Sequence, residues 1–203
     1  MALTKLDLLK QHKAEYVTPK RPVLLKVGPA KYLALEGRGA PADVAFQAAV
    51  GALYAVAFTI KMTRKAAGKG DYKIAWLEGL WWGPDKREPF AVKSPKDWRW
   101  KVLIRTPTFV SARDVAKAQG SLLAKGKVAE VAQVKIETIR EGRCVQMLHV
   151  GSYASEPATL EAMHDVAEAH GLAFRGAHHE IYLSDPRRVQ ASKLRTILRH
   201  SVA

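Results

Sequence analysis

The sequence predicts an α+β fold in which duplicated βαββ modules form one curved antiparallel sheet, with helices on one face and a central ligand cleft. Two observations favour this class. Each half of the 203-residue chain has one long amphipathic segment among short β-rich segments that glycine and proline interrupt. These segments follow in the same order in both halves. We expect the central groove on the sheet face opposite the helices.

The first half begins with two short strands separated by Gly28-Pro29. Asp43 is a suitable cap for the long helix that follows, and the basic, glycine-containing segment 65–70 ends it. The apolar stripe of this helix comprises Phe46, Val50, Leu53, Ala57 and Ile60. The expected strands of this half are 23–27, 31–36, 73–82 and 98–105.

The second half repeats this order after a connecting helix of about 111–125, which a capping box at Ser111 and Asp114 begins. Glu141-Gly142 is a hairpin signal between two strands. Ser155 is a suitable cap for the next helix, which Gly171 ends. The expected strands are 131–140, 144–150 and 178–183, followed by a last apolar segment at 194–198.

We therefore expect an N-terminal arm at 1–22 that packs loosely, and a single domain at 23–203 with pseudo-repeats at about 23–107 and 131–203. Three local matches indicate the repeat. They join Leu35-Glu36-Gly37 with His149-Val150-Gly151, Trp76-Leu77-Glu78 with His178-His179-Glu180, and Leu103-Ile104-Arg105 with Ile197-Leu198-Arg199. In this alignment Glu78 is the counterpart of Glu180.

The chain is strongly basic, because 33 lysines and arginines face 19 acidic residues and the net charge is +14. The basic residues are scattered, and no helix-turn-helix, zinc-finger or RNA-recognition pattern accompanies them. This distribution favours a solvated basic surface with weak attraction to polyanions over a specific nucleic-acid site.

Cellular location is indicated by cysteine content and hydropathy. Cys144 is the single cysteine, which excludes an intrachain disulfide and suits a reducing compartment. The segment 1–13 lacks the apolar core of a signal peptide. The apolar run 44–60 is short for a membrane span and contains Gln47 and Gly51, so it indicates a buried helix. We expect a cytoplasmic monomer or homodimer without a membrane partner.

Glu180 is the first candidate for chemistry. Side chains alternate along a strand, so His178, Glu180 and Tyr182 are expected on one face. Apolar and aromatic neighbours favour a partly desolvated carboxylate, suited either to general acid–base catalysis or to binding a cationic ligand. The structural alternative is an ion pair with Arg175 or Arg199.

The first half offers a second set of ligand-binding candidates. Alternation places Trp76, Glu78 and Trp82 on one face and Trp81 on the other, unless Gly79 forms a bulge that redirects a tryptophan. Whether Trp81 or Trp82 lines the cleft stays open, as does the alternative that these rings are core residues. Tyr153 is a further candidate, since an amphipathic ring can orient a ligand.

No metal site and no cofactor are expected. His178 and His179 point to opposite faces of a strand, and His164 and His170 do not have i, i+4 spacing. Glycine-containing segments such as Gly68-Lys69-Gly70 lack the strand–loop–helix context of a phosphate site.

Several strings resemble the stand-alone branch of the GyrI-like small-molecule-binding family. They are FQAAVGALYAVAFTIKM at 46–62, LEGLWW at 77–82, LHVGSY at 148–153, EPAT at 156–159 and HHEIYLSDPRR at 178–188. They extend over nearly the whole chain in the order of the family. The resemblance implies one α+β domain with a central cleft for a small hydrophobic or aromatic ligand.

The resemblance also implies an activity. The stand-alone branch includes hydrolases that open the cyclopropane of DNA-alkylating natural products related to yatakemycin. Its cleft glutamate corresponds to Glu180 and the aromatic neighbour to Tyr182, while the first-half motif supplies Glu78, Trp81 and Trp82. The hypothesis is that Glu180 activates water. The alternative is a non-catalytic module that binds or sequesters hydrophobic, often cationic, compounds.

Overall fold

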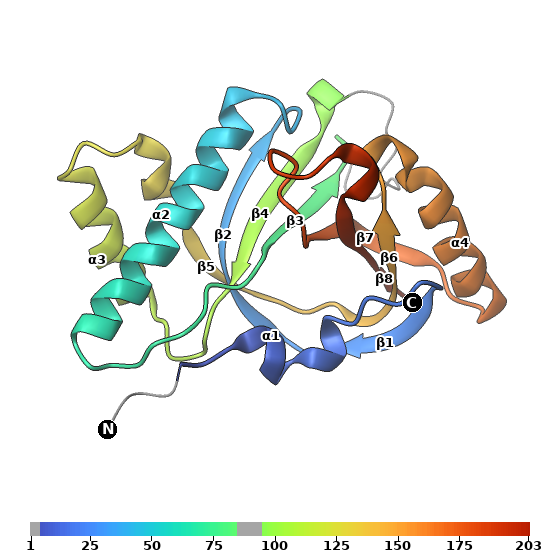
Figure 1. Cartoon of the computed structure of the whole chain (residues 1–203), viewed down its shortest axis with the longest axis horizontal. Helices are drawn as coiled ribbons and strands as arrows, with labels where there is room; N and C mark the ends of the chain where they lie inside the picture. The colour runs from blue at the N-terminus through green and yellow to red at the C-terminus, as the bar shows by residue number, and fades with distance from the viewer. Residues whose placement is uncertain (1–4, 85–94) are drawn as a thin grey trace.

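The computed structural model describes residues 5–84 and 95–203 and confirms the α+β class (Figure 1). An antiparallel sheet of eight strands runs in the order β1-β6-β8-β7-β3-β4-β2-β5. Its strands are β1 (Val23–Val27), β2 (Ala30–Arg38), β3 (Leu77–Trp82), β4 (Arg99–Arg105), β5 (Lys135–Ile139), β6 (Gly142–Val150), β7 (Phe174–Tyr182) and β8 (Arg195–Val202). The α-helices are α1 (Leu8–Gln11), α2 (Val44–Ala66), α3 (Ala112–Leu123) and α4 (Glu156–Ala169).

Two short linkers join opposite ends of the strand order, which requires the sheet to curl. Gly28-Pro29 connects edge strand β1 to β2, beside the other edge, and Arg140-Glu141 connects edge strand β5 to β6 (Figure 1). The hairpin predicted at Glu141-Gly142 is therefore wrong: β5 pairs with β2, whereas β6 pairs with β1 and β8. Arg140-Glu141 is as short as a hairpin turn, but it joins β5 to β6, which the curl of the sheet brings close together.

The strand order reads the same from both ends when each strand of the first half is exchanged for its equivalent in the second. The local matches in β2/β6 and β4/β8 agree with the ladder, because Ala34 pairs with Leu103 as Leu148 pairs with Ile197. The same ladder makes Tyr182 the counterpart of Gly79, so Glu78 corresponds to Ile181. The predicted match of Glu78 with Glu180 is thus displaced by one residue. Duplication of the module itself stays a prediction.

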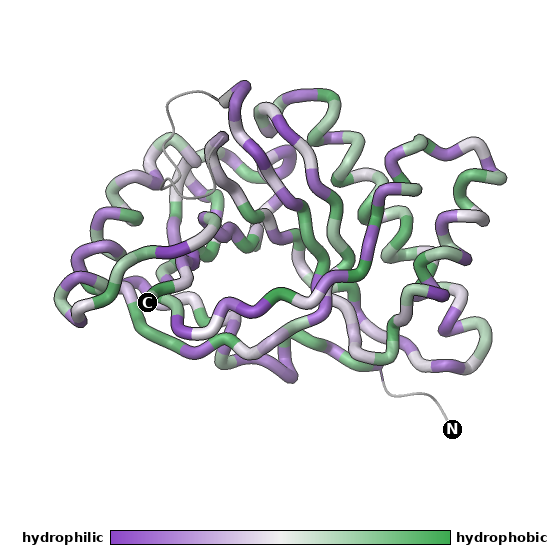
Figure 2. The backbone as a smooth tube through the Cα atoms, turned by 180° about the vertical axis from the view of Figure 1, so that it is seen from behind, coloured by the Kyte–Doolittle hydropathy of each residue, from purple (hydrophilic) through white to green (hydrophobic). Residues whose placement is uncertain are grey.

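Two hydrophobic clusters lie under the helices. The larger joins α2 and α3 to β2 and β4, and the smaller joins α4 to β6 and β8. The predicted stripe of α2 is buried except at Val50, which is half-buried. Helix α2 has the length and hydropathy of a membrane span, yet this stripe packs on the sheet. Apolar and polar stretches are interspersed along the described backbone (Figure 2).

The N-terminal arm packs closely, contrary to the prediction. It covers the sheet face opposite α2 and α4, where Tyr16 is buried and donates a hydrogen bond to Glu78 at 2.9 Å. The guanidinium of Arg105 bonds the Glu15 carboxylate at 2.6 Å. The Arg199 guanidinium donates to the Glu15 carbonyl. These contacts tie the arm to β3, β4 and β8.

A buried network of charges lies beneath this arm. The His179 ring bridges Glu78 at 3.0 Å and Glu141 at 2.8 Å, and Arg199 bonds the second oxygen of Glu141 at 2.8 Å. Burial opposes ionisation of Glu141, yet the charges of His179 and Arg199 lower its pKa to about 2. Burial likewise opposes the charge on His179, but Glu141 and Glu78 raise its pKa to about 9. Each charge of the network therefore has an opposite partner.

Glu141→Gln should destabilise the protein by about 3–5 kcal/mol near pH 7, because it leaves Arg199 and His179 with one carboxylate fewer. The folded pKa of Glu141 lies below its ordinary 4.5, so its stabilising effect is present above that pH and is lost as the pH falls toward 2. Urea unfolding at several pH values should show the difference between wild type and variant shrinking in acid. Glu161→Gln, at an exposed position, is the control. A difference that is constant with pH would contradict this assignment.

Candidate functional site

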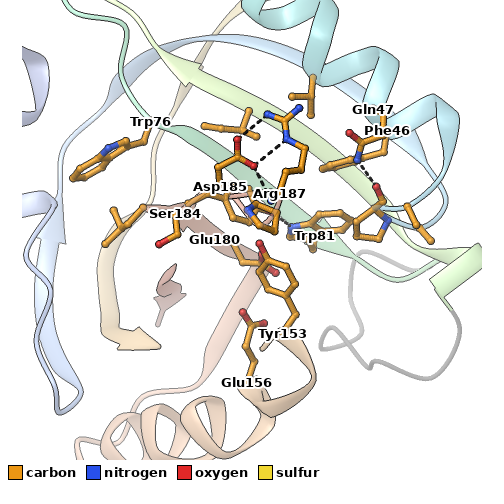
Figure 3. A pocket seen from close by; sticks show the side chains of 18 of the residues that line it. Phe46, Gln47, Trp76, Trp81, Tyr153, Glu156, Glu180, Ser184, Asp185 and Arg187 are labelled. Carbon is orange, nitrogen blue, oxygen red and sulfur yellow. Dashed lines mark hydrogen bonds and ion pairs between the residues drawn. The ribbon is translucent and has the colours of Figure 1, made fainter. Parts of the chain in front are cut away.

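A cavity of about 930 Å³ lies between α2 and α4, over β3 and β7 (Figure 3). It therefore opens on the sheet face that carries the helices, and the expectation of a groove on the opposite face is wrong. The two helices cover different halves of the sheet and leave the central strands uncovered between them. Its aromatic lining comprises Phe46, Tyr54, Trp76, Trp81, Trp98, Tyr153 and Tyr182.

The pairing of β3 with β7 decides which side chains reach this cavity. Gly79 pairs with Glu180, and Trp81 pairs with His178, so these residues share one face. Glu180 and Tyr182 line the cavity. His178 points to the same side but is buried behind the wall, with 1% of its surface exposed. In this register one face of β7 carries His178, Glu180 and Tyr182, as predicted.

Trp81 and Tyr182 form the aromatic floor. The Trp81 indole N–H donates to the Tyr182 hydroxyl at 2.9 Å, and Glu180 lines the cavity with both rings. Burial, together with the charge of Glu180, holds the pKa of Tyr182 well above its ordinary value. Phe46 stacks on Trp81 with ring centroids 5.3 Å apart, and Tyr153 meets Tyr182 edge to face. Tyr182 therefore stays neutral and keeps its O–H proton as a donor in the cavity.

The close approach of Trp81 to Tyr182 depends on Gly79. A Cβ atom at this position would lie 2.7 Å from the Tyr182 hydroxyl and 2.9 Å from the Trp81 indole nitrogen. Both distances are shorter than real Cβ contacts, so any other residue would separate the two rings. The glycine is required by this approach, and no bulge occurs in the pairing of β3.

A second carboxylate lines the cavity close to Glu180. Glu156, at the start of α4, points toward Glu180 (Figure 3). The His178 Nε2 atom lies 3.3 Å from Glu180 and 3.9 Å from Glu156, while its Nδ1 atom lies 3.0 Å from Nε2 of His200. Burial and the charge of Glu180 raise the pKa of Glu156 to about 9. The cavity thus contains two adjacent acidic groups in an aromatic setting.

The model of the GyrI-like small-molecule-binding domain matches residues 22–200. The chain belongs to this family. No curated protein sequence matches the chain significantly.

Solved structures agree with the family. An uncharacterized conserved protein from Listeria innocua is 36% identical with a TM-score of 0.90, over 98% of this chain and 100% of the other. A hydrolase from the same organism is 35% identical with a TM-score of 0.89 and the same coverage. The C-terminal domain of EcmrR, 12% identical over 90% of this chain and 97% of the other, shares the fold with a TM-score of 0.56.

The GyrI-like domain does not bring all the predicted site residues together. Trp81, Trp76 and Tyr153 line the cavity with Glu180 and Tyr182. Glu78 and Trp82 point to the opposite face, where Glu78 is fully buried between Tyr16 and His179. The sequence alone does not decide whether Trp81 or Trp82 lines the cleft. In the structure Trp81 lines it.

Sequence reasoning missed Glu156 and Phe46 as parts of the site. Both come from helices, and their distance from the strand motifs depends on how α2 and α4 sit on the sheet. The apolar stripe of α2 predicts Phe46 only as a core residue. The signal available for Glu156 was the EPAT string, in which an acidic residue precedes a proline at the beginning of a helix.

Gly79→Ala should break the contact between Trp81 and Tyr182 and cost about 1–3 kcal/mol of stability, since the added methyl group overpacks the floor. Urea unfolding and near-ultraviolet circular dichroism of the tryptophans would measure both effects. Gly51→Ala is the matched control, because a Cβ there meets nothing and the exposed helical position should gain stability. Equal spectra and stability for Gly79→Ala and wild type would contradict the assigned role.

Proposed function

We propose that this GyrI-like domain binds flat, hydrophobic electrophiles in the aromatic cavity and hydrolyses them, with Glu180 as the general base. The substrate class is the cyclopropane-containing DNA-alkylating natural products. The observation that carries the proposal is a carboxylate with 7% of its surface exposed, close enough to Tyr182 for its charge to raise the pKa of that phenol, on the floor of an aromatic cavity. The similarity to a hydrolase from Listeria innocua supports the reaction class.

The cavity is suited to this substrate by shape and polarity. Trp81, Phe46 and Trp98 form a connected aromatic group, with Trp81 stacked on Phe46 and edge-on to Trp98. Flat aromatic compounds stack on such rings and displace water from them. Exclusion of water also strengthens the interaction of Glu180 with a reacting water molecule.

The chemistry requires one positioned base. Glu180 accepts a proton from water as the water oxygen attacks the less hindered cyclopropane carbon. The carbon–carbon bond of the ring breaks, and its electron pair aromatises the adjoining dienone to a phenolate, which then takes up a proton. The product is the substrate plus one water. Because ring strain and aromatisation provide the driving force, a base that contributes about 10²–10⁴-fold is sufficient.

Tyr182 holds Glu180 in position in this mechanism. Its hydroxyl accepts from Trp81 at 2.9 Å, and in the mechanism its own O–H proton donates to Glu180 and holds the carboxylate. The remaining carboxylate lone pairs are available to a water molecule in the cavity.

Glu180→Gln should lower turnover by about 10²-fold or more while the affinity for the compound changes little, because glutamine keeps the shape but is not a base. The measurement is incubation with a duocarmycin-type cyclopropane compound, followed by mass spectrometry for a product heavier by one water. Glu161→Gln, exposed on α4, should retain wild-type turnover. Equal turnover in the Glu180→Gln variant would exclude Glu180 as the base.

A passive binding function is the second candidate, and one observation favours it. Within residues 5–84 and 95–203, neither Glu156 nor Glu180 forms an ion pair with lysine or arginine. A hydrophobic cation could supply that charge and stack on the aromatic rings.

If the domain is a passive binder, cationic aromatic dyes should bind more tightly than neutral dyes of the same shape, and should be recovered unchanged. Fluorescence titration of such a matched pair of dyes, with wild type and Glu180→Gln, measures this preference. Loss of the preference in the variant supports a counter-charge role. An equal affinity for both dyes in the wild type would argue against it.

A further inference from the structure

Three potential metal ligands converge at the cavity wall. Glu156 comes from α4, and His178 and Glu180 come from β7. Their donor atoms, one imidazole nitrogen and two carboxylate oxygens, lie within 4.8 Å of one another, and all three residues are buried. Glu156 and His178 have no part in the proposed hydrolysis, whereas Glu180 is its general base.

Glu156 indicates that this grouping is incomplete. Its side chain is 9% exposed, its Oε2 atom is the one nearest His178, and its Oε1 atom has no hydrogen-bond partner among the described residues. Leaving a buried carboxylate oxygen without a partner is costly. The side chain is nevertheless aimed at Glu180 rather than toward solvent (Figure 3). A bound cation would supply the partner that this oxygen lacks.

The distances suit a small divalent cation. Zinc binds imidazole nitrogen and carboxylate oxygen at about 2.0–2.2 Å, so neighbouring ligands of a tetrahedral site are about 3.4 Å apart. The His178–Glu180 separation is 3.3 Å, and the His178–Glu156 separation is 3.9 Å. A shift of about half an ångström in Glu156 would bring its separation from His178 to this value.

His178 also has the support that a metal-binding histidine requires. Its Nδ1 atom lies 3.0 Å from Nε2 of His200, so an N–H at Nδ1 can donate to His200 while Nε2 faces the cation. His200 is itself held by stacking on Phe174, with ring centroids 4.3 Å apart. The imidazole is therefore oriented before any cation binds.

We propose that Glu156, His178 and Glu180 form a binding site for a divalent transition-metal cation, with zinc as the preferred metal of the mixed nitrogen and oxygen ligand set. The remaining coordination position faces the cavity. A cation held there occupies the Glu180 oxygen that would act as a base. Resting on the proposed function, we expect zinc to inhibit hydrolysis.

The test is titration of the untagged full-length protein with Zn²⁺ by calorimetry and with Co²⁺ by visible absorption. Wild type should bind one equivalent at this site, and Glu156→Gln and His178→Gln should each weaken binding by about 100-fold or more. His164→Gln is the matched control, because His164, Asp165 and Glu168 form an exposed cluster of similar composition. Thermal unfolding of each variant checks that it folds.

The outcomes separate the two proposals. Unchanged affinity in Glu156→Gln and His178→Gln, or a loss confined to His164→Gln, would overturn the site. If the Glu156 and His178 variants do not fold, X-ray absorption of the zinc-loaded His164→Gln variant decides, because this variant lacks the histidine of the exposed cluster: one imidazole nitrogen with carboxylate oxygens supports the site, and its absence overturns it. Metal binding without hydrolysis of any compound refutes the proposed function and leaves the metal site standing. Hydrolysis that Zn²⁺ does not inhibit refutes occupation of Glu180.

Discussion

The pairing of Gly79 with Glu180 at the centre of the sheet is the constraint on which the site depends. It joins the two halves through β3 and β7 and assigns each side chain of these strands to a face. Glu180, Tyr182 and Trp81 reach the cavity, and Glu78 and His179 reach the opposite face. A shift by one residue would exchange the two sets, because side chains alternate with a period of two.

The two faces treat buried charge differently. Under the N-terminal arm, Glu141 meets both His179 and Arg199, and Arg105 meets Glu15. Such a network compensates the cost of burial because each charge has a partner close by. Neither carboxylate of the cavity has a lysine or arginine partner in the part of the chain that the structure describes. The face under the N-terminal arm, where the buried charges have opposite partners, stabilises the fold. The cavity face, where the carboxylates have no lysine or arginine partner among the described residues, is the candidate site for chemistry.

The sequence was sufficient for the fold class and for the face shared by Glu180 and Tyr182, because both follow from periodicity and element order. It was insufficient where a long-range register decides. The resemblance between the LEGLWW and HHEIYL strands placed Glu78 opposite Glu180 in the alignment, one residue away from the relation that the ladder defines. Composition alone does not resolve such a shift. The hairpin signal at Glu141-Gly142 failed similarly, because a curled sheet uses a short linker to join opposite edges.

The location of these two carboxylates bears on function more directly than the size of the cavity. Among the described residues only His178 forms an ion-pair contact with Glu156 and Glu180, so replacing both by apolar residues would remove a desolvation cost, and packing and stability alone do not account for them. Buried polar groups that do not stabilise the fold are concentrated at functional sites. A water molecule to be deprotonated, a hydrophobic cation or a metal ion would each make use of the same pair. They differ in what they require around it: a base needs Tyr182 to orient Glu180, a cation needs the aromatic rings, and a metal needs His178. Tyr182, the aromatic rings and His178 all lie at one wall of the cavity. The group beside the two carboxylates therefore decides which of these functions they serve.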